Sequence, residues 1–126
     1  MRNLVDSSAW IEYFRGNEKF FFMEHLIRSN AVCTNDVILA ELLPAMIHKK
    51  ENKWAEFLVW VKKSPLYIDW QEINDMQLLN FQHGNNNISI SDLIIAQNCI
   101  QNGLRLIEND KHFRAMSGYL PLKLYS

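Results

Sequence analysis

Short apolar runs alternate along this chain with longer stretches of helical periodicity. Five runs bounded by turn-forming residues are predicted to be strands: 3–5, 31–34, 66–68, 104–107 and 122–125. Apolar residues recurring every three or four positions predict helices over 9–14, 18–29, 37–49, 51–63, 70–82, 92–102 and 111–116. Alternating strands and helices favour a parallel sheet covered on both faces. We therefore expect an α/β domain in three layers (α/β/α) with a mostly parallel central sheet.

Residues at the predicted helix ends support this division. Ser7 or Ser8 is expected to cap the first helix, and Ser91 to cap the helix over 92–102. Asn35 or Asp36 would cap the helix over 37–49, and Asp69 with Glu72 forms a capping box for the helix that follows. Pro44 lies well inside a predicted helix, so a kink is expected there.

Length and composition restrict the class of protein. The chain has 126 residues, of which 48% are hydrophobic and 21% charged, as expected for one globular domain over 1–126. No apolar run is long enough for a membrane span, and Asp6 interrupts the only apolar start, so we expect a cytoplasmic protein without a membrane segment. Cys33 and Cys99 are expected to be reduced core residues. The net charge of -1 argues against a general polyanion binder.

Glu41 is the most anomalous acid in the sequence. It is the only charged residue between Val37 and Ile47, and its helical neighbours three and four residues away are all apolar. A buried, unpaired carboxylate costs several kcal/mol or takes up a proton. We therefore expect Glu41 to be buried and to face a positive partner.

Three further acids occupy comparable positions. Asp6 ends the first strand, Asp92 opens an otherwise apolar helix, and Asp110 follows the strand over 104–107. Each, taken alone, is explained by a helix cap or a turn. Together with Glu41 they predict a cluster at the carboxyl edge of the sheet, which only a cation would make tolerable. Oxygen ligands without clustered His or Cys select Mg²⁺ or Mn²⁺, and such ions support phosphodiester hydrolysis.

The stretches around these acids resemble the PIN-domain family, and closely the VapC-like toxin ribonucleases of bacterial toxin–antitoxin pairs. Four stretches carry the resemblance, in the order and spacing of the family, and together they cover essentially the whole chain: Leu4–Glu12, Val37–Leu43, Ile90–Ala96 and Asn109–Phe113.

The resemblance implies an endoribonuclease that depends on Mg²⁺ or Mn²⁺, with four acidic ligands: Asp6, Glu41, Asp92 and Asp110. The hydroxyl of Ser7 or Ser8 would lie near the bound phosphate. The resemblance also implies a homodimer that is inhibited by a VapB-like antitoxin. Apart from the resemblance, Lys111 and His112 flank Asp110 and are candidates for contact with the RNA. The alternatives are a PIN nuclease in RNA processing and a PIN-like binding module without catalysis.

Two positions depart from the family pattern. Glu108 stands where a Thr or Ser commonly precedes the last acid, so either it adds a fifth carboxylate or that corner of the site is altered. Pro44-Ala45 replaces an Arg-Gly pair that often follows the glutamate motif. Trp60 and the run Phe20-Phe21-Phe22 are expected to offer apolar surface to a protein partner. The basic residues of 48–53 are either a solvated helix end or an RNA contact.

Overall fold

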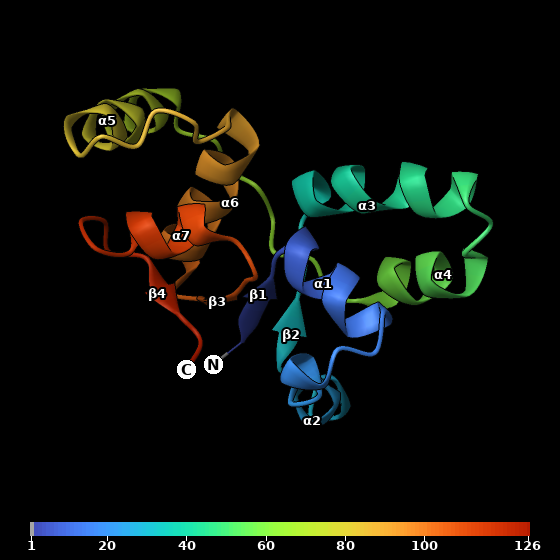
Figure 1. The fold of residues 1–126 in the computed structure, drawn as a ribbon. Coiled ribbons are helices and arrows are strands. Elements are labelled where there is room, and N and C mark those ends of the chain that lie inside the picture. The colour runs from blue at the N-terminus through green and yellow to red at the C-terminus, as the bar shows by residue number, and fades with distance from the viewer. Residues whose placement is uncertain (1) are drawn as a thin grey trace.

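Four short parallel strands form the centre of the molecule. The computed structural model describes residues 2–126 and is drawn in Figure 1. The strands lie in the order β2-β1-β3-β4, and every neighbouring pair is parallel. Their bounds are β1 (Asn3–Val5), β2 (Val32–Cys33), β3 (Arg105–Ile107) and β4 (Lys123–Leu124). The prediction of a parallel central sheet is confirmed.

Helices cover both faces of this sheet, as the three-layer prediction requires. They are α1 (Ser7–Phe14), the 3-10 turn η1 (Glu18–Phe20), α2 (Met23–Arg28), α3 (Asp36–His48), α4 (Asn52–Trp60), α5 (Trp70–Gln82), α6 (Ile90–Asn102) and α7 (Lys111–Met116). Figure 1 shows α1, α3 and α4 on one side of the strands and α5, α6 and α7 on the other. Within residues 2–126, none of the helices has the length and apolarity that crossing a membrane requires.

The carboxyl edge of the sheet is the part of the fold that matters for function. Helices α1, α3 and α7 begin two to four residues after β1, β2 and β3 end, so all three start at this edge. Helix α6 runs back against the strands and enters β3 through Gly103, whose φ of +61° lies in the left-handed region that closes a helix. The first turn of α6 therefore reaches the same edge, and α3 and α6 contact each other there.

The core lies between the sheet and the two helical layers. Trp10, Phe113 and Leu4 are fully buried in it, and Trp10 stacks on Phe14 at a centroid distance of 5.5 Å. Cys33 and Cys99 are free and buried, as expected from the sequence. Trp60, by contrast, is 88% exposed at the end of α4, as expected of a side chain that offers apolar surface.

The predicted strand over 66–68 is wrong, because this segment pairs with side chains instead of a neighbouring strand. Gln97 accepts a hydrogen bond from the backbone N–H of Asp69 and donates one to its carbonyl (3.2 and 3.0 Å). Asn98 donates to the carbonyl of Pro65, and Gln101 donates to that of Tyr67. The amides on one face of α6 thus satisfy the backbone groups of the extended segment.

Several helix boundaries also differ from prediction. Asp6 itself caps α1, since its carboxylate accepts from the backbone N–H of Ser8. Ser89, and not Ser91, caps α6. The helix expected over 18–29 is divided into η1 and α2, whereas α3 continues through Pro44.

Asn35 joins the sheet to α3 and α6. Its side-chain oxygen accepts a hydrogen bond from the backbone N–H of Ile38 (2.9 Å), which caps α3 as predicted. Its amide nitrogen donates to the side-chain oxygen of Asn98 (3.1 Å), and both residues are buried. A buried amide with both ends bonded is costly to remove, because its partners lose their hydrogen bonds without gaining water.

We expect Asn35→Ala to lower the free energy of unfolding by about 2 kcal/mol, since it removes a cap and leaves buried groups unpaired. Urea unfolding measures this change. The control is Asn52→Ala at the exposed start of α4, for which a change within about 0.5 kcal/mol is expected. Equal effects of the two substitutions would contradict the role given to Asn35.

Candidate functional site

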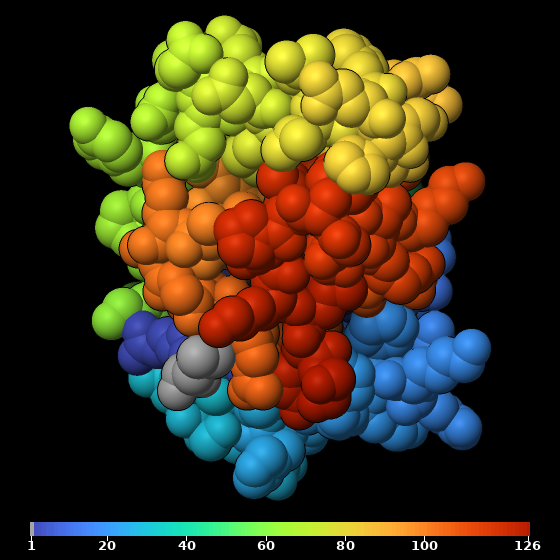
Figure 2. Space-filling view, turned by 90° about the vertical axis from the view of Figure 1, so that its left-hand side faces the viewer, coloured from blue at the N-terminus to red at the C-terminus, as the bar shows by residue number. Residues whose placement is uncertain are grey.

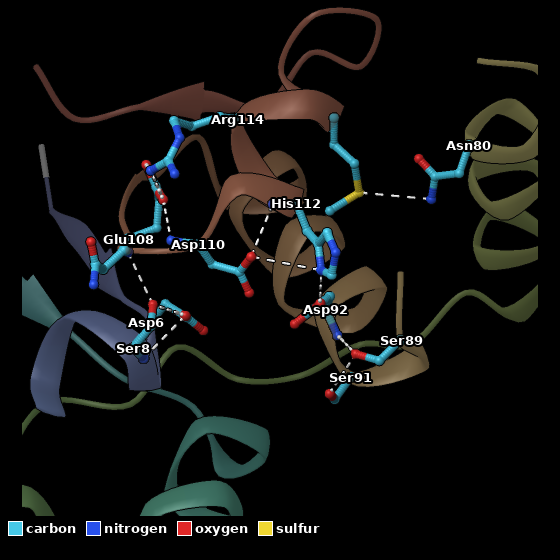
Figure 3. A network of polar contacts seen from close by, with 12 residues as sticks. Asp6, Ser8, Asn80, Ser89, Ser91, Asp92, Glu108, Asp110, His112 and Arg114 are labelled. Carbon is cyan, nitrogen blue, oxygen red and sulfur yellow. Dashed lines mark hydrogen bonds and ion pairs between the residues drawn. The ribbon is translucent and has the colours of Figure 1, made fainter. Parts of the chain in front are cut away.

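The four acids singled out in the sequence come from four different elements. Asp6 ends β1, Asp92 lies in the first turn of α6, Asp110 caps α7, and Glu41 lies in α3. Figure 3 shows the carboxylates of Asp6, Asp92 and Asp110 turned toward a common space at the carboxyl edge of the sheet. We call these four residues the acidic centre.

Asp6 is the most enclosed member of the acidic centre, with 3% of its surface exposed. One oxygen, Oδ2, accepts hydrogen bonds from the backbone N–H of Ser8 (3.2 Å) and from its hydroxyl (2.5 Å). Burial raises the pKa of Asp6, the bonds from Ser8 oppose the rise, and the charge of Asp92 adds to it. Asp6 is thus held in one orientation at a position unfavourable for its charge.

Glu41 reaches the acidic centre from the solvent side of α3. It is exposed, so the sequence-based expectation of burial is wrong; the outer side of α3 is apolar but not covered. Ser7 donates a hydrogen bond from Oγ to Oε1 of Glu41 (3.3 Å). Partial burial of the carboxylate raises the pKa of Glu41, and the charges of Asp6, Asp92 and Asp110 raise it further. Glu41 therefore interacts electrostatically with all three other acids.

Asp92, Asp110 and His112 make up the tightest group of charged side chains at the site. His112 Nδ1 lies 3.6 Å from Asp92 Oδ2 and 3.6 Å from Asp110 Oδ1. One donor atom from each of the three residues lies within 4.8 Å of the others, a spacing that suits a shared cation. Burial raises the pKa of Asp92, the charge of Asp110 adds to the rise, and the bonds from Ser89 and His112 oppose it.

The two serines of the first turn have separate partners. Ser8 Oγ donates to Asp6 and accepts from the backbone N–H of Asn109 (3.0 Å), which links the end of β1 to the loop before α7. Ser7 faces Glu41. In this structure both hydroxyls hold parts of the acidic centre in place, a function that the sequence alone did not indicate.

Glu108 turns away from the acidic centre and bonds to its own loop. Its Oε2 accepts from the backbone N–H of Asp110 (2.6 Å) and from Arg114 (3.0 Å), and only 9% of its side chain is exposed. Figure 3 shows this pair on the far side of Asp110 from Asp92. Of the two readings left open by the sequence, the structure therefore favours an altered corner over a fifth carboxylate.

The sequence matches a known family, and the fold is similar to those of known proteins. The family model of the PIN domain matches residues 4–119. VapBC2 from Rickettsia felis, solved bound to a DNA fragment from its promoter, is similar over 99% of this chain and 98% of its own, with 17% identity and a TM-score of 0.77. FitAcB from Neisseria gonorrhoeae is similar over 98% and 96%, with 20% identity and a TM-score of 0.71. None of the curated proteins matches the chain in sequence.

The raised pKa of Asp92 predicts a dependence of stability on pH. Because the folded state raises this pKa above the ordinary 3.8, the charged form destabilises the fold, and stability falls as pH rises through the folded pKa. Without divalent metal at pH 7, Asp92→Asn should therefore raise the free energy of unfolding by about 0.5–2 kcal/mol. The gain should vanish below pH 3.8, where Asp92 is neutral in both states.

Urea unfolding in EDTA at several pH values measures this gain. Asp75→Asn on the exposed face of α5 is the matched control and should change stability little at any pH. A variant at position 92 that is less stable than the parent at pH 7 would show that the acids do not strain the fold.

Proposed function

The chain belongs to the PIN-domain family, and from this membership and the acidic centre we propose that it is an endoribonuclease that requires Mg²⁺ or Mn²⁺. The observation that carries the proposal is that the carboxylates of Asp6, Asp92 and Asp110, from elements far apart in sequence, face a common space at one edge of the sheet (Figure 3). Glu41, which accepts a hydrogen bond from Ser7, is close enough for their charges to raise its pKa. Like charges at short range repel, so such a cluster is best explained by a cation that it holds during function.

Asp6, Glu41, Asp92 and Asp110 would hold the ion. The oxygen donors of these four residues suit a hard divalent cation. The raised pKa values of Asp6, Glu41 and Asp92 are expected of acids that lie close together without one. A bound Mg²⁺ or Mn²⁺ supplies activation of water and stabilisation of charge at phosphorus.

The remaining polar residues would keep this arrangement in place. Ser8 fixes the orientation of Asp6, and Ser7 holds Glu41. The pair of Glu108 and Arg114 fixes the backbone that presents Asp110. Lys111 is exposed beside Asp110 and supplies a positive charge for the RNA backbone, which the acids would otherwise repel.

We further propose that the protein is the toxin of a VapBC-type pair, acting in the cytoplasm as a homodimer that a VapB-like antitoxin inhibits. Support comes from the likeness of the fold to VapBC2 from Rickettsia felis, which extends over nearly the whole of both chains. Exposed Trp60 and Phe21 offer apolar surface for such contacts. An RNA-processing nuclease and a binding module without catalysis are the alternatives.

Purified protein is expected to cleave single-stranded RNA at internal positions when Mg²⁺ or Mn²⁺ is present. Cleavage should stop when EDTA is added. Asp6→Asn should lower the rate by about 100-fold or more, since a ligand contributes several kcal/mol to the charge stabilisation of such reactions. Gel analysis of end-labelled RNA measures the products. The control Asp75→Asn, prepared in the same way, should cleave like the parent.

Cleavage that resists EDTA and persists in Asp6→Asn would contradict the metal mechanism. Absence of cleavage in the parent, together with metal binding by calorimetry, would favour the binding module.

Expression of the chain in a bacterial host is expected to arrest growth if it is a toxin. Asp6→Asn should relieve the arrest, because it removes cleavage while retaining a cap for α1. Growth after induction is the measurement, with protein amounts checked by immunoblot. Normal growth with an active nuclease at equal amounts would favour the RNA-processing alternative.

A further inference from the structure

A polar groove adjoins the acidic centre on the side of His112. Its volume is about 350 Å³, within the range of pockets that hold a small molecule. The lining comes from the loop Gly84–Ile88, which we call the amide loop, and from α7. On α7 the lining residues are Lys111, His112 and Ala115. Since His112 also contacts Asp92 and Asp110, the groove and the acidic centre share one wall.

The backbone of the amide loop is held firmly at both ends. Asn85 donates from its amide to the hydroxyl of Tyr119 (2.9 Å), and that hydroxyl donates to Asn80. His83 stacks on the ring of Tyr119 with centroids 3.9 Å apart. At the other end, Gln77 donates to the carbonyl of Ile88 (2.8 Å). Figure 2 shows the loop, in yellow, seated against the red C-terminal segment.

The side chains at the middle of this loop are exposed. Asn86 and Asn87 both line the groove, and each amide offers donors and an acceptor. A rigid backbone with exposed amides favours recognition of a planar group with donors and acceptors at its edge, and Asn pairs with base edges in this way.

Lys111 gives the groove its positive charge. The neighbouring cation Arg114 is paired with Glu108, whereas Lys111 is exposed on the groove wall. A lysine beside exposed amides matches a nucleotide, which carries a phosphate next to a base. Because base edges are open only where RNA is unpaired, the groove suits a single strand.

We propose that this groove binds the nucleotide next to the scissile phosphate of single-stranded RNA, with Asn86 and Asn87 on the base edge and Lys111 on a phosphate. This inference rests on the proposed function and adds the residues that determine cleavage sequence. Asn86 and Asn87 select the base, while Lys111 contributes affinity regardless of sequence.

Two measurements test the groove. In the first, the parent and the double variant Asn86→Ala/Asn87→Ala cleave an RNA pool with randomised sequence, and the cut sites are read by sequencing. The preference for one base next to the cut should fall about tenfold in the double variant. Asn52→Ala on α4, also an exposed asparagine, should keep the preference of the parent.

The second measurement is RNA binding, by fluorescence anisotropy, with Asp6→Asn added to every protein so that the RNA stays intact. Lys111→Ala should weaken binding of short single strands of any sequence. It should also reduce, by about one, the slope of the logarithm of the binding constant against the logarithm of the salt concentration. Lys123→Ala, an exposed lysine of β4 paired with the start of β3 away from the site, is the control and should bind like its parent.

The outcomes separate the groove from the proposed function. A parent that does not cleave, with binding still weakened by the double variant and by Lys111→Ala, overturns the nuclease and keeps the groove. A parent that cleaves, with preference and affinity the same in these variants as in the controls, overturns the groove and keeps the nuclease. If the double variant fails to fold, Lys111→Ala, which lies on α7, still tests the groove through RNA binding.

Discussion

Repulsion between carboxylates is the constraint on which the rest of this structure depends. Three acids of the acidic centre have raised pKa values, and in each case burial is the main cause and a neighbouring acid adds to it. Without a cation the charged carboxylates therefore destabilise the folded state. In the proposed function a cation held by the four side chains would offset this repulsion.

Short polar contacts hold the acids in place. Ser8 ties the end of β1 to the loop before α7, and Glu108 with Arg114 fixes the next turn of that loop. The negative charge of Glu108 is neutralised outside the acidic centre, so the departure from the family pattern adds no further repulsion there. These contacts lie in the loops and helices that follow β1 and β3, at the carboxyl edge of the sheet.

Asp6, Asp92 and Asp110 are each explained by local structure, as helix caps or a first-turn acid, so the prediction of a cluster depends on their joint position at one edge of the sheet. Glu41 stands out in the sequence because its apolar neighbours predict burial, and that expectation is wrong, since one side of α3 is apolar and yet exposed. The strand over 66–68 could not be rejected from its own residues. Its backbone groups are taken by Gln97 and Asn98, and nothing in a helical pattern shows which buried amides will reach a distant segment. Long-range side-chain pairing overrides local propensity in this case.

The distribution of charge affects how selective the proposed nuclease is for its cut sites. A chain with a net charge of -1 attracts RNA weakly as a whole, and the acids repel it further. If the chain acts on RNA as proposed, affinity for the polyanion has to come from the proposed ion and from the few cations beside it, which leaves little general binding to all sequences. Hydrogen bonds from the amide loop to a base would then make up a large share of the binding free energy, because contacts to the phosphate backbone of the RNA contribute little. The scarcity of positive charge is thus itself a reason to expect a nuclease that chooses its cut sites.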